Sequence, residues 1–268
     1  MKRTTVPAAY ILFVMLAFAA PLAKADHADM LIAQNPAGKL VTGIADFDNF
    51  NFVIGERSFL GELTQVDLGD DPRALFFIDD PGFNSRDQAT LDLDNPPAGS
   101  FLALPGNADV NFSFPAITIG GQTANLFYWN GTGAVDFQPT TDMTLTLSVG
   151  SDAAIADGTA NTIAGFNLET TSVDGVIHRH PDYVLDQITG SAYPAEGVYL
   201  LPLVAQMAGK TDSDFFTIAF KTPNISDEVQ QMAADYVAAH VVPEPSTWLL
   251  AAAGVVALCC RRRVSRRE

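Results

Sequence analysis

Seven consecutive residues at positions 143–149, Met-Thr-Leu-Thr-Leu-Ser-Val, place an apolar side chain at every second position. An extended strand brings every second side chain onto one face, so this run predicts a strand with one buried face. Further β-branched or aromatic runs occur at residues 59–68, 74–78, 109–114, 125–129 and 197–206. Turn-forming residues separate them: Asp-Pro-Gly at 80–82, Asn-Pro-Pro at 95–97 and Asn-Gly at 130–131. The pattern predicts an all-β fold, an antiparallel β-sandwich of jelly-roll or immunoglobulin-like type.

One stretch near the C-terminal end has helical periodicity instead. Ser226 suits the N-cap position, and the two acidic residues after it suit the positive end of the helix dipole. Apolar side chains then recur at helical spacing, at positions 229, 232, 233, 236 and 237. We therefore predict a β body over residues 26–225 and one short helix over residues 226–241. We expect the helix to pack on the body, with a protruding stalk as the alternative.

The N-terminal end has the features of an export signal. Lys2 and Arg3 precede an apolar stretch at residues 8–20. Ala23 and Ala25 then supply the small side chains that signal peptidase requires around its cleavage site. We predict a signal peptide over residues 1–25 and an exported protein that begins at Asp26.

Residues 242–268 combine a short polar motif, an apolar run at 248–260 and a terminal cluster of five arginines. The apolar run has about 13 residues, fewer than the roughly 20 of a transmembrane helix, which suits a transient membrane anchor. The arrangement resembles the PEP-CTERM sorting domain of Gram-negative bacteria, with Pro243, Glu244 and Pro245 as its named tripeptide. The resemblance implies recognition by an exosortase, removal of the tail, and delivery to the cell surface or extracellular matrix. A simple tail anchor is the alternative.

The segment between these two signals is strongly acidic and contains no cysteine. Eight of the 15 Lys and Arg residues lie in the terminal segments, which leaves seven against 29 of the 31 acids, or a net charge of about −22. Such a surface disfavours nucleic acid and anionic lipid and attracts cations, with plain solubility outside the cell as the alternative. Cys259 and Cys260 both lie in the tail, so the body has no disulfide, thiolate metal site or thiol nucleophile.

Histidine is rare in the chain, and its positions suggest a metal site. Three of the four histidines fall in two short motifs, His27-x-Asp29 and His178-x-His180. Residues two apart on a strand project from one face, about 6.5–7 Å apart along the strand. Two imidazoles can then share one ion, each nitrogen about 2.0–2.1 Å from zinc. We predict a zinc site formed by His27, His178 and His180 and completed by Asp29 or water, with incidental surface histidines as the alternative.

A second resemblance involves the segments around these histidines. Residues 26–32, 38–43, 178–180, 197–200 and 213–216 are similar to segments of a family of bacterial surface-anchored proteins, over residues 26–46 and 174–222. Some members with PEP-CTERM tails are repressed by a zinc-uptake regulator. The resemblance implies a surface protein made during zinc shortage, with the four residues of the two motifs as ligands. Asp26 stands where members usually have a glycine.

Other functions have weaker support in the sequence. Acidic residues cluster in three places, Asp67 with Asp70 and Asp71, Asp79 with Asp80 and Asp87, and Asp92 with Asp94. They offer oxygen ligands for calcium, the second candidate ion, but lack EF-hand spacing. Aromatic residues at 127–129 would suit an adhesive or structural protein that binds exopolysaccharide, although the alternation of side chains along a strand places at least one of the three in the core. Gly-x-Ser-x-Gly, His-Glu-x-x-His and phosphate-binding loops are absent, so we expect no enzyme, with a secreted hydrolase as the remaining alternative.

Overall fold

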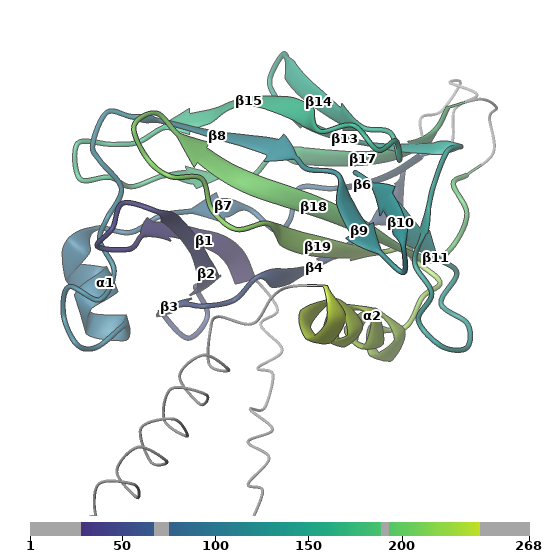
Figure 1. The fold of residues 1–268 in the computed structure, drawn as a ribbon, viewed down its shortest axis with the longest axis horizontal. Helices are drawn as coiled ribbons and strands as arrows, with labels where there is room; N and C mark the ends of the chain where they lie inside the picture. The colour runs from purple at the N-terminus through teal and green to yellow at the C-terminus, as the bar shows by residue number, and fades with distance from the viewer. Residues whose placement is uncertain (1–27, 67–74, 189–192, 242–268) are drawn as a thin grey trace, which may run out of the picture.

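The computed structural model describes residues 28–66, 75–188 and 193–241. Within these residues the chain forms 19 strands and two helices, and most strand pairs are antiparallel (Figure 1). The predicted all-β fold with a short helix near the C-terminal end is confirmed. The predicted signal peptide and C-terminal sorting segment lie outside the described residues. None of the described helices is long and apolar enough to cross a membrane.

Three larger sheets and one small ribbon make up the fold. The first sheet has the order β16 (His178–Arg179), β7 (Phe83–Asn84), β1 (Ala28–Gln34), β2 (Leu40–Asp46), β3 (Asn51–Ile54). The second has the order β14 (Asp152–Ala156), β13 (Met143–Val149), β17 (Asp182–Gln187), β6 (Leu75–Ile78), β5 (Thr64–Val66). The ribbon pairs β9 (Ile117–Ile119) with β10 (Gln122–Ala124).

The third sheet contains the longest strand and has a branch. Its main path is β12 (Gln138–Pro139), β11 (Phe127–Trp129), β18 (Val198–Met207), β19 (Phe216–Lys221), β4 (Ser58–Glu62). The far half of β18 also pairs with β8 (Asp109–Phe114), which pairs in turn with β15 (Ile163–Thr170). Two strand pairs in the structure are parallel, β4 with β19 and β1 with β7. The second of these pairs positions the site described below.

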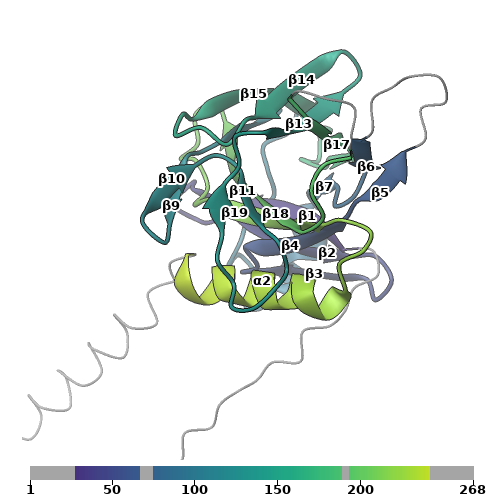
Figure 2. The same ribbon diagram turned by 90° about the vertical axis from the view of Figure 1, so that its right-hand side faces the viewer.

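The main hydrophobic core lies between the sheets. Leu145 and Leu147 of β13 face this core, as the alternation of residues 143–149 predicts. The opposing sheet contributes every second residue of β19, and the ring of Phe220 there contacts Tyr183 of β17 at 4.9 Å between centroids. The view along the sheets shows the two layers enclosing this interior (Figure 2). Burial of one face of each sheet therefore holds the layers together.

The first strand, β1, is buried on both faces. Met30 and Ile32 point into the main core, whereas Leu31 and Ala33 point into a smaller cluster on the opposite face. That second face is covered by α1 (Gln88–Asp94), whose Leu91 is buried in the smaller cluster. The sequence reading did not predict α1, because seven residues with one buried apolar side chain give no helical periodicity.

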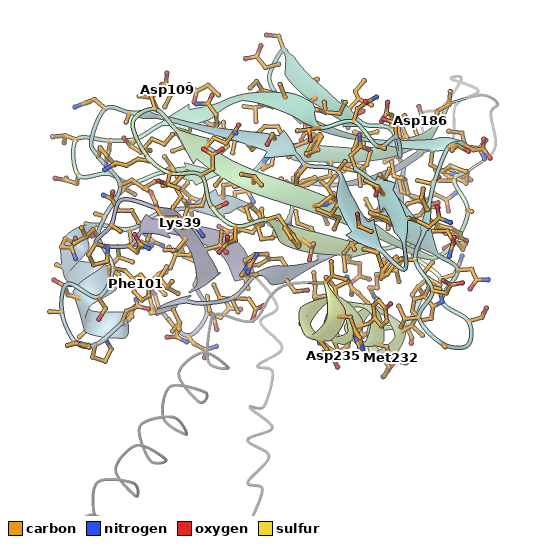
Figure 3. The ribbon with its side chains drawn as sticks, viewed as in Figure 1. Lys39, Phe101, Asp109, Asp186, Met232 and Asp235 are labelled. Carbon is orange, nitrogen blue, oxygen red and sulfur yellow. The ribbon has the colours of Figure 1, made fainter. Side chains whose placement is uncertain are left out.

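The second helix, α2 (Asp227–His240), packs across β4 and β19 on the outer side of the third sheet (Figures 1 and 2). Ser226 caps it as predicted, accepting a hydrogen bond from the Val229 amide. Ala233 and Val237 are buried against the sheet, whereas Met232 points away from it and is 48% exposed (Figure 3). The expectation that the helix docks on the body is therefore correct, although Met232 is not part of its buried face.

Aromatic residues 127–129 pack in this same region and do not form a platform. Phe127 and Trp129 are buried in the cluster beneath α2, and Tyr128 is half-buried with its hydroxyl bonded to the Glu196 carbonyl. The interpretation of these three residues as an exposed carbohydrate-binding surface is therefore wrong. A strand places neighbouring side chains on opposite faces, and in β11 both faces are covered.

We predict that Gln230 is the main polar contact that holds α2 on the sheet. Its buried side-chain amide donates to the carbonyls of Gly61 and Ala219, at 2.7 and 2.8 Å. Gln230→Ala removes both bonds and should lower the free energy of unfolding by about 1–3 kcal/mol, measured by urea denaturation. Gln231→Ala, a change at the half-buried neighbouring residue whose side chain bonds only to Asp235 of the same helix, should stay within about 0.5 kcal/mol of the native protein. Equal stability of the two variants would contradict a docked α2.

Candidate metal centre

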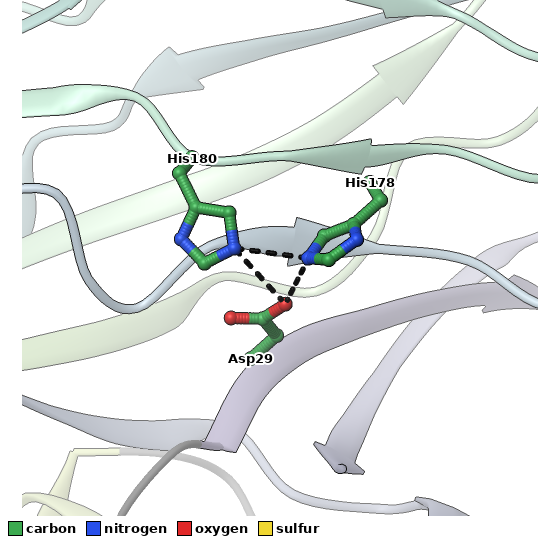
Figure 4. A group of neighbouring side chains, drawn as sticks. All are labelled: Asp29, His178 and His180. Carbon is green, nitrogen blue, oxygen red and sulfur yellow. Dashed lines mark hydrogen bonds and ion pairs between the residues drawn. The ribbon is translucent and has the colours of Figure 1, made fainter.

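Three side chains from two distant segments of the sequence meet on one face of the first sheet, beside its edge strand β16 (Figure 4). Asp29 lies near the start of β1, His178 begins β16, and His180 follows two residues later. Strand β7 lies between β1 and β16, parallel to the first and antiparallel to the second. Both imidazoles therefore reach across β7 toward the carboxylate of Asp29.

The three ligand atoms are spaced as ligands of one ion would be. The Nε2 atoms of His178 and His180 are 2.9 Å apart, and they lie 3.4 and 3.8 Å from Oδ2 of Asp29. Bonds of about 2.0–2.1 Å in a tetrahedral zinc site would separate ligand atoms by about 3.3–3.4 Å. The observed separations bracket this value. A single divalent ion could therefore contact all three atoms after small side-chain adjustments.

The residues of β7 and the turn before it provide the space for this arrangement. Phe83 points into the main core, so Gly82 and Asn84 fall on the face that carries Asp29 and the histidines. A Cβ atom at Gly82 would lie 2.8 Å from Oδ1 of Asp29 and 2.9 Å from Cε1 of His180. The absence of a side chain at Gly82 is what lets Asp29 and His180 approach each other.

Contacts on the outer side orient both imidazole rings. Nδ1 of His180 lies 2.9 Å from a carboxylate oxygen of Asp80 and 3.1 Å from the carbonyl of Asp79. The ring of His178 stacks on Phe47, with 5.2 Å between centroids. Metal-binding histidines commonly have such a partner on the second nitrogen, because it fixes the ring orientation and leaves the other nitrogen for the ion.

Asp29 is buried and only half satisfied. The Gly82 amide donates to Oδ1 at 2.9 Å, but Oδ2, which faces both histidines, accepts no hydrogen bond. Burial raises the pKa of the Asp29 carboxyl, although His180, the Gly82 amide and His178 act in the opposite direction. A buried carboxylate oxygen without a partner is costly. A cation between Oδ2 and the two imidazoles would remove this cost.

The structure unites three of the four predicted ligands and leaves the fourth untested. His27 lies outside the described residues, so its predicted approach to His180 remains a prediction. The signal-cleavage alanines and the Pro243–Pro245 tripeptide also lie outside them. His240, in the last turn of α2, stacks on Tyr236 and is not part of the cluster.

Two of the three acidic clusters considered for calcium do not form a comparable group, and the third, Asp67 with Asp70 and Asp71, lies outside the described residues. Of their members in the described residues, Asp87 caps α1, while Asp92 and Asp94 accept hydrogen bonds from the amides of Gly99 and Phe52. Asp80 contacts His180 from outside the three-ligand group. Among the described residues, Asp29, His178 and His180 are the one group of histidines and acids with metal-like spacing. The acidic turns therefore serve the local backbone.

Several contributors to the site were not identified from the sequence. Gly82 was assigned only to a turn, and Asp80 only to a possible calcium cluster. Asn84 and Phe47 carried no signal, because their roles arise from pairing between strands far apart in sequence. The Asp-Pro-Gly turn was the available clue, since it marks a point where the backbone passes close to another element.

Comparisons with known proteins identify the C-terminal segment and leave the body unassigned. Residues 241–263 match the PEP-CTERM protein-sorting motif, in agreement with the predicted sorting segment. No curated protein matches the chain. One solved structure to which the chain shows a weak similarity is the CssB subunit complemented with a donor strand from the CssA subunit of enterotoxigenic Escherichia coli colonization factor CS6. It has 16% identity and a TM-score of 0.19, covers 47% of this chain and 82% of its own, and supports no argument about function.

We predict that Asp29 destabilises the metal-free protein at neutral pH. Because its pKa is raised in the folded state, ionisation opposes folding above that pKa, and the penalty disappears as pH falls below the ordinary value of 3.8. Asp29→Asn keeps the bond from Gly82 and should raise the free energy of unfolding by about 1 kcal/mol at pH 7 in a chelator. The gain should shrink toward pH 3.5. The exposed Asp235→Asn serves as control, and a loss of stability in Asp29→Asn at pH 7 would contradict the prediction.

Proposed function

We propose that this protein is an exported surface protein whose body binds a divalent metal ion, zinc by preference, through Asp29, His178 and His180. The observation that carries the proposal is the buried Oδ2 of Asp29, which accepts no hydrogen bond and faces two imidazole nitrogens, with all three atoms within 4.8 Å of one another. Such a centre can bind a cation without any rearrangement of the backbone.

The ligand chemistry favours zinc over calcium. Two imidazole nitrogens and one carboxylate oxygen are a common zinc ligand set, whereas calcium takes six to eight oxygen ligands. The contacts of His180 with Asp79 and Asp80 resemble the carboxylate–histidine arrangement found around bound zinc. His27 remains a predicted additional ligand. We assign the protein a binding role and no catalytic one.

The location follows from the C-terminal motif. The match at residues 241–263 supports processing by an exosortase, and the predicted signal peptide supports export by the general pathway. The acidic body would favour cations around the displayed protein. An exopolysaccharide-binding surface has lost its main support, because residues 127–129 are covered. The proposal is therefore a displayed cation-binding protein.

We predict that zinc stabilises the native protein and that each histidine of the pair is required. At zinc concentrations 100 times the dissociation constant, binding adds about 2.7 kcal/mol, or roughly 5–10 °C in Tm for a body of this size. His178→Ala and His180→Ala should each weaken zinc binding by more than about 100-fold in competition with a chelating dye. Affinity should also fall as pH decreases, because protons compete with zinc for the same atoms.

The matched control is His240→Ala, which removes a histidine outside the cluster and should leave zinc affinity unchanged. All measurements use protein without a polyhistidine tag. Native-like zinc affinity in the His178→Ala and His180→Ala double variant would show that this cluster is not the binding site.

We predict that the tail is removed during export. Mass spectrometry of protein recovered from the cell surface should detect peptides from the body, such as those containing Lys39 or Lys221, but none from Trp248 onward. Replacement of Pro243, Glu244 and Pro245 by alanine should retain the tail and leave the protein in the membrane fraction. An intact tail on the surface-exposed native protein would contradict exosortase processing.

A further inference from the structure

Asn84 is a buried polar side chain without a partner. Its exposed fraction is 0%, and neither its amide nitrogen nor its carbonyl oxygen makes a hydrogen bond. Buried side-chain amides are normally bonded, and each unpartnered group costs about 1–3 kcal/mol. This unfavourable free energy, inside a sheet, indicates that Asn84 has a hydrogen-bond partner in the functional state of the protein.

The strand register places Asn84 beside the metal centre. Asn84 pairs with His178 of β16 on one side and with Leu31 of β1 on the other. Its neighbour Phe83 points into the main core, so Asn84 projects on the opposite face, the face of Asp29 and the two histidines. His178 starts at the register position of Asn84 and places its Nε2 3.4 Å from Oδ2 of Asp29, so the side chains of His178 and Asn84 are neighbours on this face.

Neighbouring polar groups on this face have other roles. Arg86, two residues further along, is held over the rings of Phe47 and Phe52, at 4.7 and 4.2 Å from their centroids. The Gly82 amide is bonded to Oδ1 of Asp29. In the segment around β7, Asn84 is therefore the neutral side chain whose donor and acceptor both lack a hydrogen bond.

A water bound to an ion at this site would supply a hydrogen-bond partner. Asp29, His178 and His180 provide three ligands, and a zinc ion with three protein ligands keeps a position for water. A carboxamide can accept a hydrogen bond from such a water and can also donate to it. We propose that Asn84 is a positioning residue that holds a water ligand on the metal ion. This inference rests on the proposed metal-binding function. It implies that the water ligand of the ion can be exchanged.

The test compares the native full chain, without an added tag, with its Asn84→Leu variant. Leucine has a similar size but cannot hydrogen-bond, so zinc affinity should fall about 10–100-fold, as for other residues that orient metal ligands. The visible spectrum of the cobalt-substituted protein should change, because the outer ligand is no longer held in place. The metal-free variant should be at least as stable as the native protein, since an unpartnered buried amide has been removed.

The matched control is Thr217→Val in β19. It also removes a fully buried polar atom that lacks a partner, but its strand is in the third sheet and carries no ligand of the cluster. Zinc affinity and the cobalt spectrum of this variant should equal those of the native protein. If zinc affinity falls in Asn84→Leu but not in Thr217→Val, the loss comes from a change at the metal centre and not from the removal of a buried polar group as such.

Three results would overturn the inference. Native-like affinity and an unchanged cobalt spectrum in Asn84→Leu would show that Asn84 does not hold a ligand, while leaving the proposed zinc site intact. A loss of stability in the metal-free Asn84→Leu protein, comparable to its loss of zinc-binding free energy, would assign Asn84 a structural role. Weakened binding in His27→Ala but not in Asn84→Leu would show that His27 fills the position. If the native protein binds no zinc at all, the proposed function itself fails.

Discussion

The parallel pairing of β1 with β7 is the constraint on which the metal centre depends. Because β1 is buried on both faces, its register cannot slip by one residue without moving Met30 and Leu31 into the wrong clusters. That register fixes Asp29 on the face opposite the main core, two strands away from the edge strand β16. Strand β7 is only two residues long, yet it determines how far β16 lies from β1 and therefore how far each imidazole must reach. The spacing of the three ligand atoms follows from the packing of the two cores.

The same geometry explains why two unfavourable features persist in the fold. Asp29 holds a buried carboxylate oxygen without a hydrogen bond, and Asn84 holds a buried amide in the same state. Both lie on one face of the first sheet. Because Gly82 has no side chain, nothing separates Asp29 from His180 at that position. Some buried polar groups elsewhere also lack a hydrogen bond, such as the Thr217 hydroxyl, whereas others are bonded, such as Gln230 beneath α2. Asp29 and Asn84 are thus two unsatisfied groups close to the histidine pair, which fits the metal binding proposed above.

The sequence predicted the parts of this structure that depend on local patterns. The alternation at residues 143–149 gave β13, the apolar run at 197–206 gave β18, and the cap at Ser226 gave α2. The two short motifs predicted that Asp29, His178 and His180 belong to one site. The pairing of β1 with β7 could not be predicted, since a two-residue strand has no periodicity and parallel neighbours are joined by long connections. The resemblance to zinc-regulated surface proteins remains a prediction.

The candidate metal centre and the helix that precedes the sorting motif lie on different sheets, which bears on how the protein can act. The candidate metal centre lies on the face of the first sheet that α1 covers, whereas α2, the last described element before the sorting motif in the sequence, packs on the outer side of the third sheet. Buried side chains, including Val237 and Gln230, hold α2 to the body up to its last turns. Cleavage after the helix would therefore leave the core and the ligands unchanged. The histidines remain about half exposed at the sheet edge, so an ion can reach them in the folded protein after export.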